Sequence, residues 1–222
     1  MVKKNAFVVV LFTLLMVSCN KDTEMIYSCN ETINNWVEEN LDEIHLMTRA
    51  DWYSLPKNHK TAAYRAFTFD QRLAFWKEKL TEVKSLEGWS KEEILHIEKV
   101  EKYLYDHLYL LKGDYLTDEQ ADELDKFFYL WQNYAIENLG WTKQTCIAIA
   151  GNGNKMTNKA GDVSNKGSYE PNLNEPDNPE DCNCNVTYDF CWPVEYCEDL
   201  TCISSSSGCG WFFASSCNGV CK

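Results

Sequence analysis

The sequence lacks the short motifs that identify most enzyme and nucleotide-binding sites. It contains no His-Glu-x-x-His zinc motif, no Gly-x-Ser-x-Gly nucleophile elbow, and no glycine-rich loop for a phosphate or a dinucleotide. Without such a motif, no residue is indicated as catalytic or as a metal ligand. We therefore expect a protein that is not an enzyme and that uses no cofactor.

Basic residues are scarce compared with acidic residues. The 222 residues include 34 Asp and Glu against 21 Lys and Arg, which gives a formal net charge of −13 at pH 7. Contacts with phosphate groups require clustered Lys and Arg, so this balance argues against nucleic acid as a partner. A soluble acidic surface accounts for the charge.

No apolar run is long enough to span a bilayer. Residues 6–17 are largely apolar, follow Lys3 and Lys4, and end beside the small residue Ser18. A short apolar run behind a positive N-terminus is typical of a signal peptide. We predict that residues 1–18 direct export and are then removed.

Cys19 ends a segment, Leu-Met-Val-Ser-Cys, that resembles the bacterial lipobox. The resemblance implies that Cys19 receives diacylglycerol and holds the chain at a membrane through a tether, residues 19–27. Asn20 replaces the aspartate that favours inner-membrane retention, which implies the outer membrane or the cell surface. Plain secretion, with Cys19 disulfide-bonded or free, is the alternative.

Helices are indicated for the long region that follows. Three segments begin with Ser or Thr followed three residues later by Glu or Gln, the signature of a capping box; the pairs are Thr68 with Gln71, Ser90 with Glu93, and Thr117 with Gln120. Each pair precedes apolar residues at helical spacing, and the last two helices are expected to stop at Gly113 and Gly140.

Two weaker helices are predicted nearer the N-terminus. Apolar residues three and four apart indicate one at 33–44, and a short one is expected at 58–67, with a break over 51–56. No segment before Cys146 alternates as a strand does. We predict a mainly α protein in which residues 28–150 form a helical bundle.

The next segment, residues 151–181, changes in composition. Asn, Gly and Pro supply nearly half of it, and apolar residues are few. Such a segment cannot bury a core of its own, so we predict a flexible linker.

Residues 182–222, which we call the tail, form a small C-terminal module rich in cysteine. A segment this short usually needs cross-links or a metal to fold. Export favours disulfides, and the spacing lacks the separated Cys-x-x-Cys pairs of zinc modules. We predict that all eight cysteines form disulfides, with 105 pairings open; they are Cys182, Cys184, Cys191, Cys197, Cys202, Cys209, Cys217 and Cys221.

The tail also resembles fulvocin C, a small secreted bacteriocin with eight cysteines. The resemblance covers about a fifth of the chain and is carried by four pieces and by Cys197 and Cys202 between them; the pieces are Cys-Asn-Cys-Asn from Cys182, Tyr-Asp-Phe-Cys-Trp-Pro from Tyr188, Gly-Cys-Gly-Trp from Gly208, and Cys-Asn-Gly from Cys217. It implies a bacteriocin-like module. The longer N-terminal region resembles larger fulvocin C-related proteins, whose function is poorly defined.

Two cysteines lie outside the tail and Cys19. Cys29 precedes the first predicted helix, and Cys146 follows the last. A bond between them would close a loop of more than a hundred residues and stabilise the bundle by about 4–5 kcal/mol in the chain-entropy model. We predict this bond; two unpaired or buried thiols are the alternative.

The tail is rich in aromatic residues, which we consider as an interaction surface for a membrane interface or a protein; they are Tyr188, Phe190, Trp192, Tyr196, Trp211, Phe212 and Phe213. The alternative is that they pack over the disulfides as a miniature core.

Two functions follow from this organisation. The first is an anchored extracytoplasmic protein that displays a bacteriocin-like module, or releases it after cleavage in the linker. The second is a structural or binding lipoprotein whose tail recognises an unknown protein or cell-surface target and kills nothing.

Overall fold

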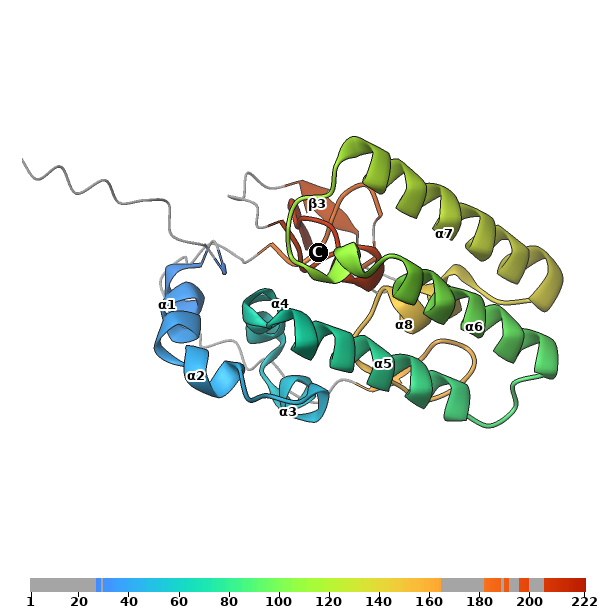
Figure 1. Ribbon diagram of the computed structural model, residues 1–222, viewed down its shortest axis with the longest axis horizontal. Coiled ribbons are helices and arrows are strands. Elements are labelled where there is room, and N and C mark those ends of the chain that lie inside the picture. The colour runs from blue at the N-terminus through green and yellow to red at the C-terminus, as the bar shows by residue number, and fades with distance from the viewer. Residues whose placement is uncertain (1–26, 29, 165–181, 189, 192–195, 200–205) are drawn as a thin grey trace, which may run out of the picture.

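The computed structural model describes residues 27–28, 30–164, 182–188, 190–191, 196–199 and 206–222. The described chain is mainly helical, as predicted, and ends in a disulfide-rich tail (Figure 1). Its elements are α1 (Glu31–Glu39), α2 (Leu41–Ile44), α3 (Arg49–Ser54), α4 (Lys57–Ala66), α5 (Phe69–Ser85), α6 (Lys91–Asp106), η1 (Leu108–Leu111), α7 (Asp118–Leu139), α8 (Lys143–Ala150), β1 (Lys155–Met156), β2 (Val163–Ser164), β3 (Cys197–Asp199), η2 (Trp211–Phe213) and β4 (Gly219–Cys221).

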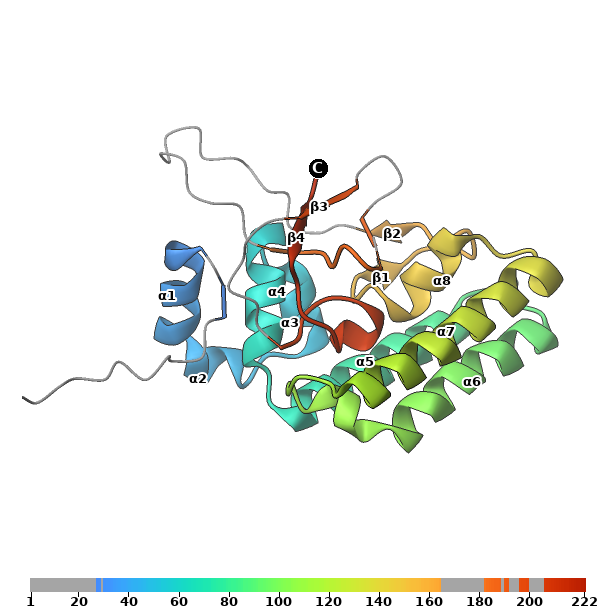
Figure 2. The ribbon, with the colours of Figure 1, turned by 90° about the horizontal axis from the view of Figure 1, so that it is seen from above.

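The three capping boxes predicted from sequence are confirmed. Thr68, Ser90 and Thr117 each accept a hydrogen bond from the backbone N–H three residues on, and the Glu or Gln there accepts one in return. They begin α5, α6 and α7, which run side by side in Figures 1 and 2. α7 ends at Gly140 in the left-handed conformation (φ 68°), as predicted.

Other helix boundaries differ from the prediction. The predicted break at 51–56 is wrong for residues 51–54, which are helical. Thr48 and Asp51 form a fourth capping box there and begin α3. The expected helix 33–44 is divided at Asn40, whose side chain donates to the carbonyl of Trp36 (2.7 Å). α6 ends at Asp106, and the residues after it form the 3₁₀ turn η1.

Residues 151–164 were expected to begin the flexible linker, but they pack against the helices. β1 and β2 form a short antiparallel pair, and Met156 is 0% exposed. Buried cations from the helices bind the backbone here: Arg49 Nε donates to the carbonyl of Gly153 (3.0 Å), and Lys79 Nζ to that of Asn154 (2.5 Å). The predicted linker therefore begins too early, and its remainder, 165–181, lies outside the described residues.

Cys146 does not form the predicted bond. It lies in α8 with 0% exposure, and its thiol is free in the described structure. α8 buries nearly every side chain, so Cys146 packs in the core, and burial raises the pKa of its thiol to about 12. The predicted bond is wrong for Cys146, and Cys29 lies outside the described residues.

The tail is cross-linked as predicted wherever the structure describes it. Three bonds are defined, and Cys182 is also disulfide-bonded; the three are Cys184–Cys197, Cys191–Cys221 and Cys209–Cys217. Strands β3 and β4 pair antiparallel beside these bonds. Cys202 lies outside the described residues.

The tail shares one hydrophobic core with the helices. Trp211, Phe212 and Ala214 are buried in the same cluster as the inner residues of α5, α6, α7 and α8. Both views place the tail, coloured red, between α4 and the beginning of α7 (Figures 1 and 2). The expectation that its aromatic residues form either an exposed surface or a separate miniature core is therefore wrong for Trp211 and Phe212.

Candidate ligand site between the helices and the tail

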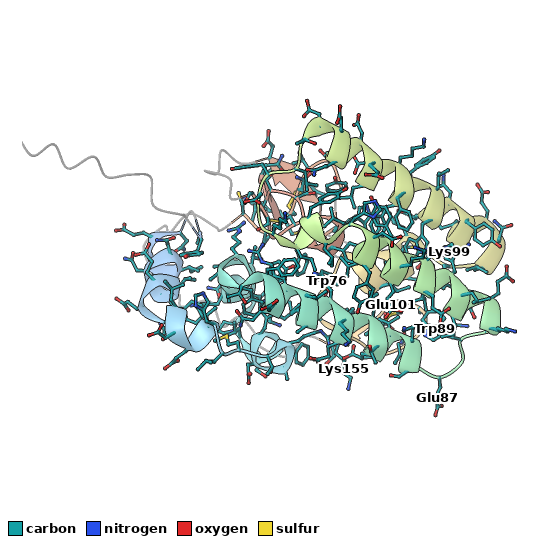
Figure 3. The ribbon with its side chains drawn as sticks, viewed as in Figure 1. Trp76, Glu87, Trp89, Lys99, Glu101 and Lys155 are labelled. Carbon is teal, nitrogen blue, oxygen red and sulfur yellow. A yellow bond between two sulfur atoms is a disulfide. The ribbon has the colours of Figure 1, made fainter. Side chains whose placement is uncertain are left out.

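Three consecutive aromatic residues of the tail, Trp211, Phe212 and Phe213, enter the helical core; we call them the wedge. Trp211 stacks on Phe128 of α7, with ring centroids 4.1 Å apart. Phe212 and Phe213 both meet Trp76 of α5 edge-on, each at 5.2 Å. Trp76, labelled in Figure 3, thus lies at the centre of the contact between helices and tail.

The wedge has an unusual backbone. Phe212 and Phe213 have φ values of 54° and 56°, in the left-handed region, where a residue with a side chain costs about 1–2 kcal/mol. The conformation is held by packing and by a hydrogen bond from Tyr64 Oη to the carbonyl of Phe212 (3.3 Å). Burial of the two rings therefore outweighs the backbone strain.

Arg65 of α4 connects the tail to the N-terminal segment. Its side chain is buried and donates to three carbonyls far apart in sequence: Ser207 (3.1 Å), Cys182 (3.3 Å) and Tyr27 (2.7 Å). Hydrogen bonds from a charged donor are stronger than neutral ones, so one helical side chain holds the tail at two separate points, Cys182 and Ser207.

A cavity of about 360 Å³ lies where the tail meets α3, α4 and the loop 151–164. Its lining combines aromatic side chains, asparagines and two lysines; the residues used below are Trp52, Lys57, Lys60, Asn152, Asn154, Asn183, Tyr188, Phe190 and Phe213. A volume in this range is typical of sites for small molecules. Neither the helices nor the tail forms this cavity alone.

The aromatic residues predicted as an interaction surface differ in burial and in position. Tyr188, Phe190 and Phe213 are half-buried and line the cavity, whereas Trp211 and Phe212 are core residues. Tyr196 is 60% exposed, and Trp192 lies outside the described residues.

Lys60 is the buried cation of the cavity. It is only 7% exposed, and its Nζ donates to Asn154 Oδ1 (3.1 Å) and lies 5.3 Å and 5.1 Å from the ring centres of Trp52 and Tyr53. Burial lowers the pKa of Lys60 to about 8, since a low-dielectric environment disfavours the charged form. An anion placed beside Lys60 would favour its charged form.

Sequence reasoning did not identify Lys60, Asn152 or Asn154 as site residues. A signal was present in the alternating glycines of the segment Gly-Asn-Gly-Asn from Gly151. A Cβ on Gly153 would lie 2.5 Å from Phe75 Cζ, so the chain approaches the core closely here and turns the asparagines toward the cavity. Such glycines mark an ordered approach rather than a linker.

A sulfur cluster borders the cavity. The Sγ atoms of Cys184, Cys191 and Cys197 lie within 4.8 Å of one another, a spacing that would suit a metal ion. Each of the three sulfurs is in a disulfide, however, and metal binding requires the thiolate. The cluster is therefore two neighbouring cross-links.

The disulfides indicate an extracellular protein, because such bonds persist outside the reducing cytosol. Among the residues that the structure describes, no helix combines the length and the apolar character needed to cross a bilayer. Comparison with known proteins found no family model that matches the chain, and no similar curated protein or solved structure.

Proposed function

We propose that this chain is an exported, lipid-anchored protein of the bacterial surface that binds a ligand with its helices and tail acting as one body. The observation that carries the proposal is the burial of Trp211 and Phe212 among helix side chains, at 4% and 0% exposure. A tail that buries two aromatic side chains in the helical core supports a function performed in place.

Release of the tail would expose both rings to water. Aromatic side chains bury roughly 150–250 Å² each, so the pair accounts for on the order of 10 kcal/mol at about 25 cal/mol per Å². The two hydrogen bonds from Arg65 to the tail carbonyls of Ser207 and Cys182 would also be lost. Cleavage in the linker alone would therefore leave the tail attached.

A protease site inserted within residues 168–178 tests this reasoning. After cleavage, the helical piece and the tail should co-elute in gel filtration and separate only in denaturant. Because Cys182 is disulfide-bonded, the experiment is repeated with Cys182→Ser, and masses are measured without reductant. A covalent connection is then distinguished from a shared core.

The bacteriocin-like function is the alternative, supported by the resemblance of the tail to fulvocin C. It requires a tail that keeps its shape after release. If the cleaved tail elutes alone as a monomer, and the oxidised peptide inhibits growth of related strains at micromolar concentration, the one-body proposal fails and the bacteriocin takes its place.

The anchor is tested separately. Cys19→Ala should move the protein from the membrane fraction to the soluble fraction and abolish metabolic labelling with palmitate. Unchanged fractionation, together with an unlabelled wild-type protein, would contradict the lipid anchor without affecting the cavity.

A further inference from the structure

The two cross-links of the sulfur cluster lie close enough to exchange partners. Cys184 is bonded to Cys197, and Cys191 is bonded to Cys221. The Sγ atom of Cys191 lies within 4.8 Å of the Sγ atoms of both Cys184 and Cys197. A thiolate breaks a disulfide by attacking one of its sulfurs and releasing the other. A thiolate at Cys191 would therefore have the neighbouring disulfide within reach of a short side-chain movement.

The strand pairing brings the other two sulfurs together. Cys197 of β3 and Cys221 of β4 are direct partners in the antiparallel ladder. The next pair, Tyr196 and Lys222, exchanges both backbone hydrogen bonds (2.9 and 3.0 Å), so Cys197 and Cys221 form a non-hydrogen-bonded pair. Such partners point to the same face and have Cα atoms about 4.5 Å apart, within the range of about 4.4–6.8 Å for a disulfide. Their sulfurs can therefore bond across the strands.

A second pairing of the same four sulfurs thus fits the folded tail. It joins Cys184 to Cys191 through the sulfur cluster, and Cys197 to Cys221 across the strands. The third possible pairing would join Cys184 to Cys221. The backbone of Cys184 is instead bridged to Gly219, and the Sγ atom of Cys221 is not among the three that lie within 4.8 Å of one another. The fold therefore favours the second pairing over the third.

We propose that these four cysteines form a thiol–disulfide exchange site, at which an external thiol interconverts the two favoured pairings. The thiol enters at Cys221, which is half-buried beside the exposed residue Lys222, whereas Cys184 is only 3% exposed. The external thiolate attacks the Sγ atom of Cys221 and forms a mixed disulfide there. The bond to Cys191 breaks, and Cys191 leaves as a thiolate.

Two further attacks complete the exchange inside the protein. The Cys191 thiolate attacks the Sγ atom of Cys184, and Cys197 leaves as a thiolate. Cys197 then attacks the Sγ atom of Cys221 across the strands and releases the external thiolate. Two disulfides are present before and after these steps, so no net oxidation or reduction occurs and the external thiol acts as a catalyst.

The exchange changes how the tail is tied together. Cys191 is bonded to strand β4 in the structure, and in the second pairing it is bonded to Cys184 instead. Cys184, Cys191 and Cys221 all line the cavity between the helices and the tail, so the pairing alters one wall of that cavity. The inference goes beyond the proposed function and does not depend on the lipid anchor.

Mass spectrometry on the full mature chain with Cys19→Ala tests the site. The oxidised protein is incubated with or without reduced glutathione at about pH 8, where a thiol is partly ionised. After acid quenching, free thiols are blocked with N-ethylmaleimide, and the protein is digested without reductant. Glutathione should raise the second pairing at least about tenfold over the untreated sample, while the Cys209–Cys217 bond stays intact.

Two results of this experiment would overturn the proposal. One is that glutathione fails to raise the second pairing. The other is that the third pairing, or bonds to Cys209, form as readily as the second pairing, because the exchange would then not follow the geometry of the folded tail.

A substitution starts the exchange without added thiol. Cys221→Ser leaves Cys191 as a free thiol beside the bond between Cys184 and Cys197. Attack on Cys184 releases Cys197, so N-ethylmaleimide added in denaturant should label Cys197 as well as Cys191. Label confined to Cys191, in a variant with wild-type far-UV circular dichroism, would contradict the exchange.

Cys217→Ser is the matched control, since it frees Cys209, which lies outside the sulfur cluster. The label should stay on Cys209 in this variant. Label that also appears on Cys197 would mean that exchange does not require the sulfur cluster, and the assignment would fall. If Cys221→Ser does not fold, the glutathione experiment on the tail without substitutions decides.

Discussion

The helical region, residues 31–150, and the tail, residues 182–222, reach their structures by different physical routes. The helices carry local start signals, and their inner faces repeat at helical spacing. The described tail has only short strands, one 3₁₀ turn and disulfides. The wedge is nevertheless buried in the helical core, where Trp211 and Phe212 pack against α5 and α7. The cross-linked tail and the helices therefore share one core.

The largest expected effect comes from removing the wedge ring that both regions share. Phe212→Ala should lower the free energy of unfolding by about 3–5 kcal/mol, because it leaves a cavity against Trp76 and Phe128. Urea unfolding followed by far-UV circular dichroism reports on the helices. Tyr196→Ala, at an exposed tail position, is the control and should change stability by less than about 0.5 kcal/mol. A normal helical transition in Phe212→Ala would mean that the regions are independent.

A disulfide confined to the tail should also stabilise the helices. The Cys191–Cys221 bond spans 30 residues, so replacing both cysteines by Ala should cost about 3.5 kcal/mol in the chain-entropy model. If the chain unfolds as one unit, this loss appears in the helical transition. Unchanged helical unfolding, together with a tail that becomes protease-sensitive, would separate the two regions.

Arg65→Met tests the polar part of the same junction. Three carbonyls lose a charged donor, and the expected loss is about 2–3 kcal/mol. Arg65→Lys keeps the charge but lacks the branched head, so it should recover only part of the loss. Full recovery by Lys would show that the charge, and not the three directed bonds, holds the tail.

The smallest expected effect concerns Lys79 of α5, which binds the backbone of the loop 151–164. Burial lowers the pKa of Lys79 to about 7, so above this pH the unfolded chain binds more protons than the folded chain. Stability should therefore rise with pH from 7 to 8.5, and the rise continues until the unfolded lysine also loses its proton. Lys60, with a pKa of about 8, adds a smaller rise in the same direction. The wild type should gain about 2 kcal/mol over this window and Lys79→Met less than about 1 kcal/mol.

Urea midpoints at pH 7.0 and 8.5 measure this difference. Lys91→Met, at an exposed position, should keep the wild-type rise. An equal rise in Lys79→Met would mean that another group controls the pH dependence.

The helices were predictable because their signals are local. Thr68, Ser90 and Thr117 each lie three residues from the partner that closes the capping box. α3 was not predicted, although Thr48 pairs with Asp51 in the same way, because its capping box has Asp where the other three have Glu or Gln. α8 was missed because its side chains are buried on nearly every side, so that it shows no amphipathic face.

The candidate site was far less predictable, because it depends on contacts between residues distant in sequence. The tail aromatics were noticed, but their division between core and cavity follows from docking against α5 and α7. Lys60 resembles any surface lysine of a short helix until the segment Asn152–Asn154 is placed beside it. Polar composition alone could not show that buried cations order the loop.

The left-handed pair in the wedge has a consequence for how the chain matures. Phe212 and Phe213 hold their φ values of 54° and 56° only when helical side chains surround them, and they lie between Cys209 and Cys217. The helices precede the tail in the chain. A tail oxidised without the helices would lack the packing that holds the segment between Cys209 and Cys217, and it would have to select one of the many pairings that eight cysteines allow.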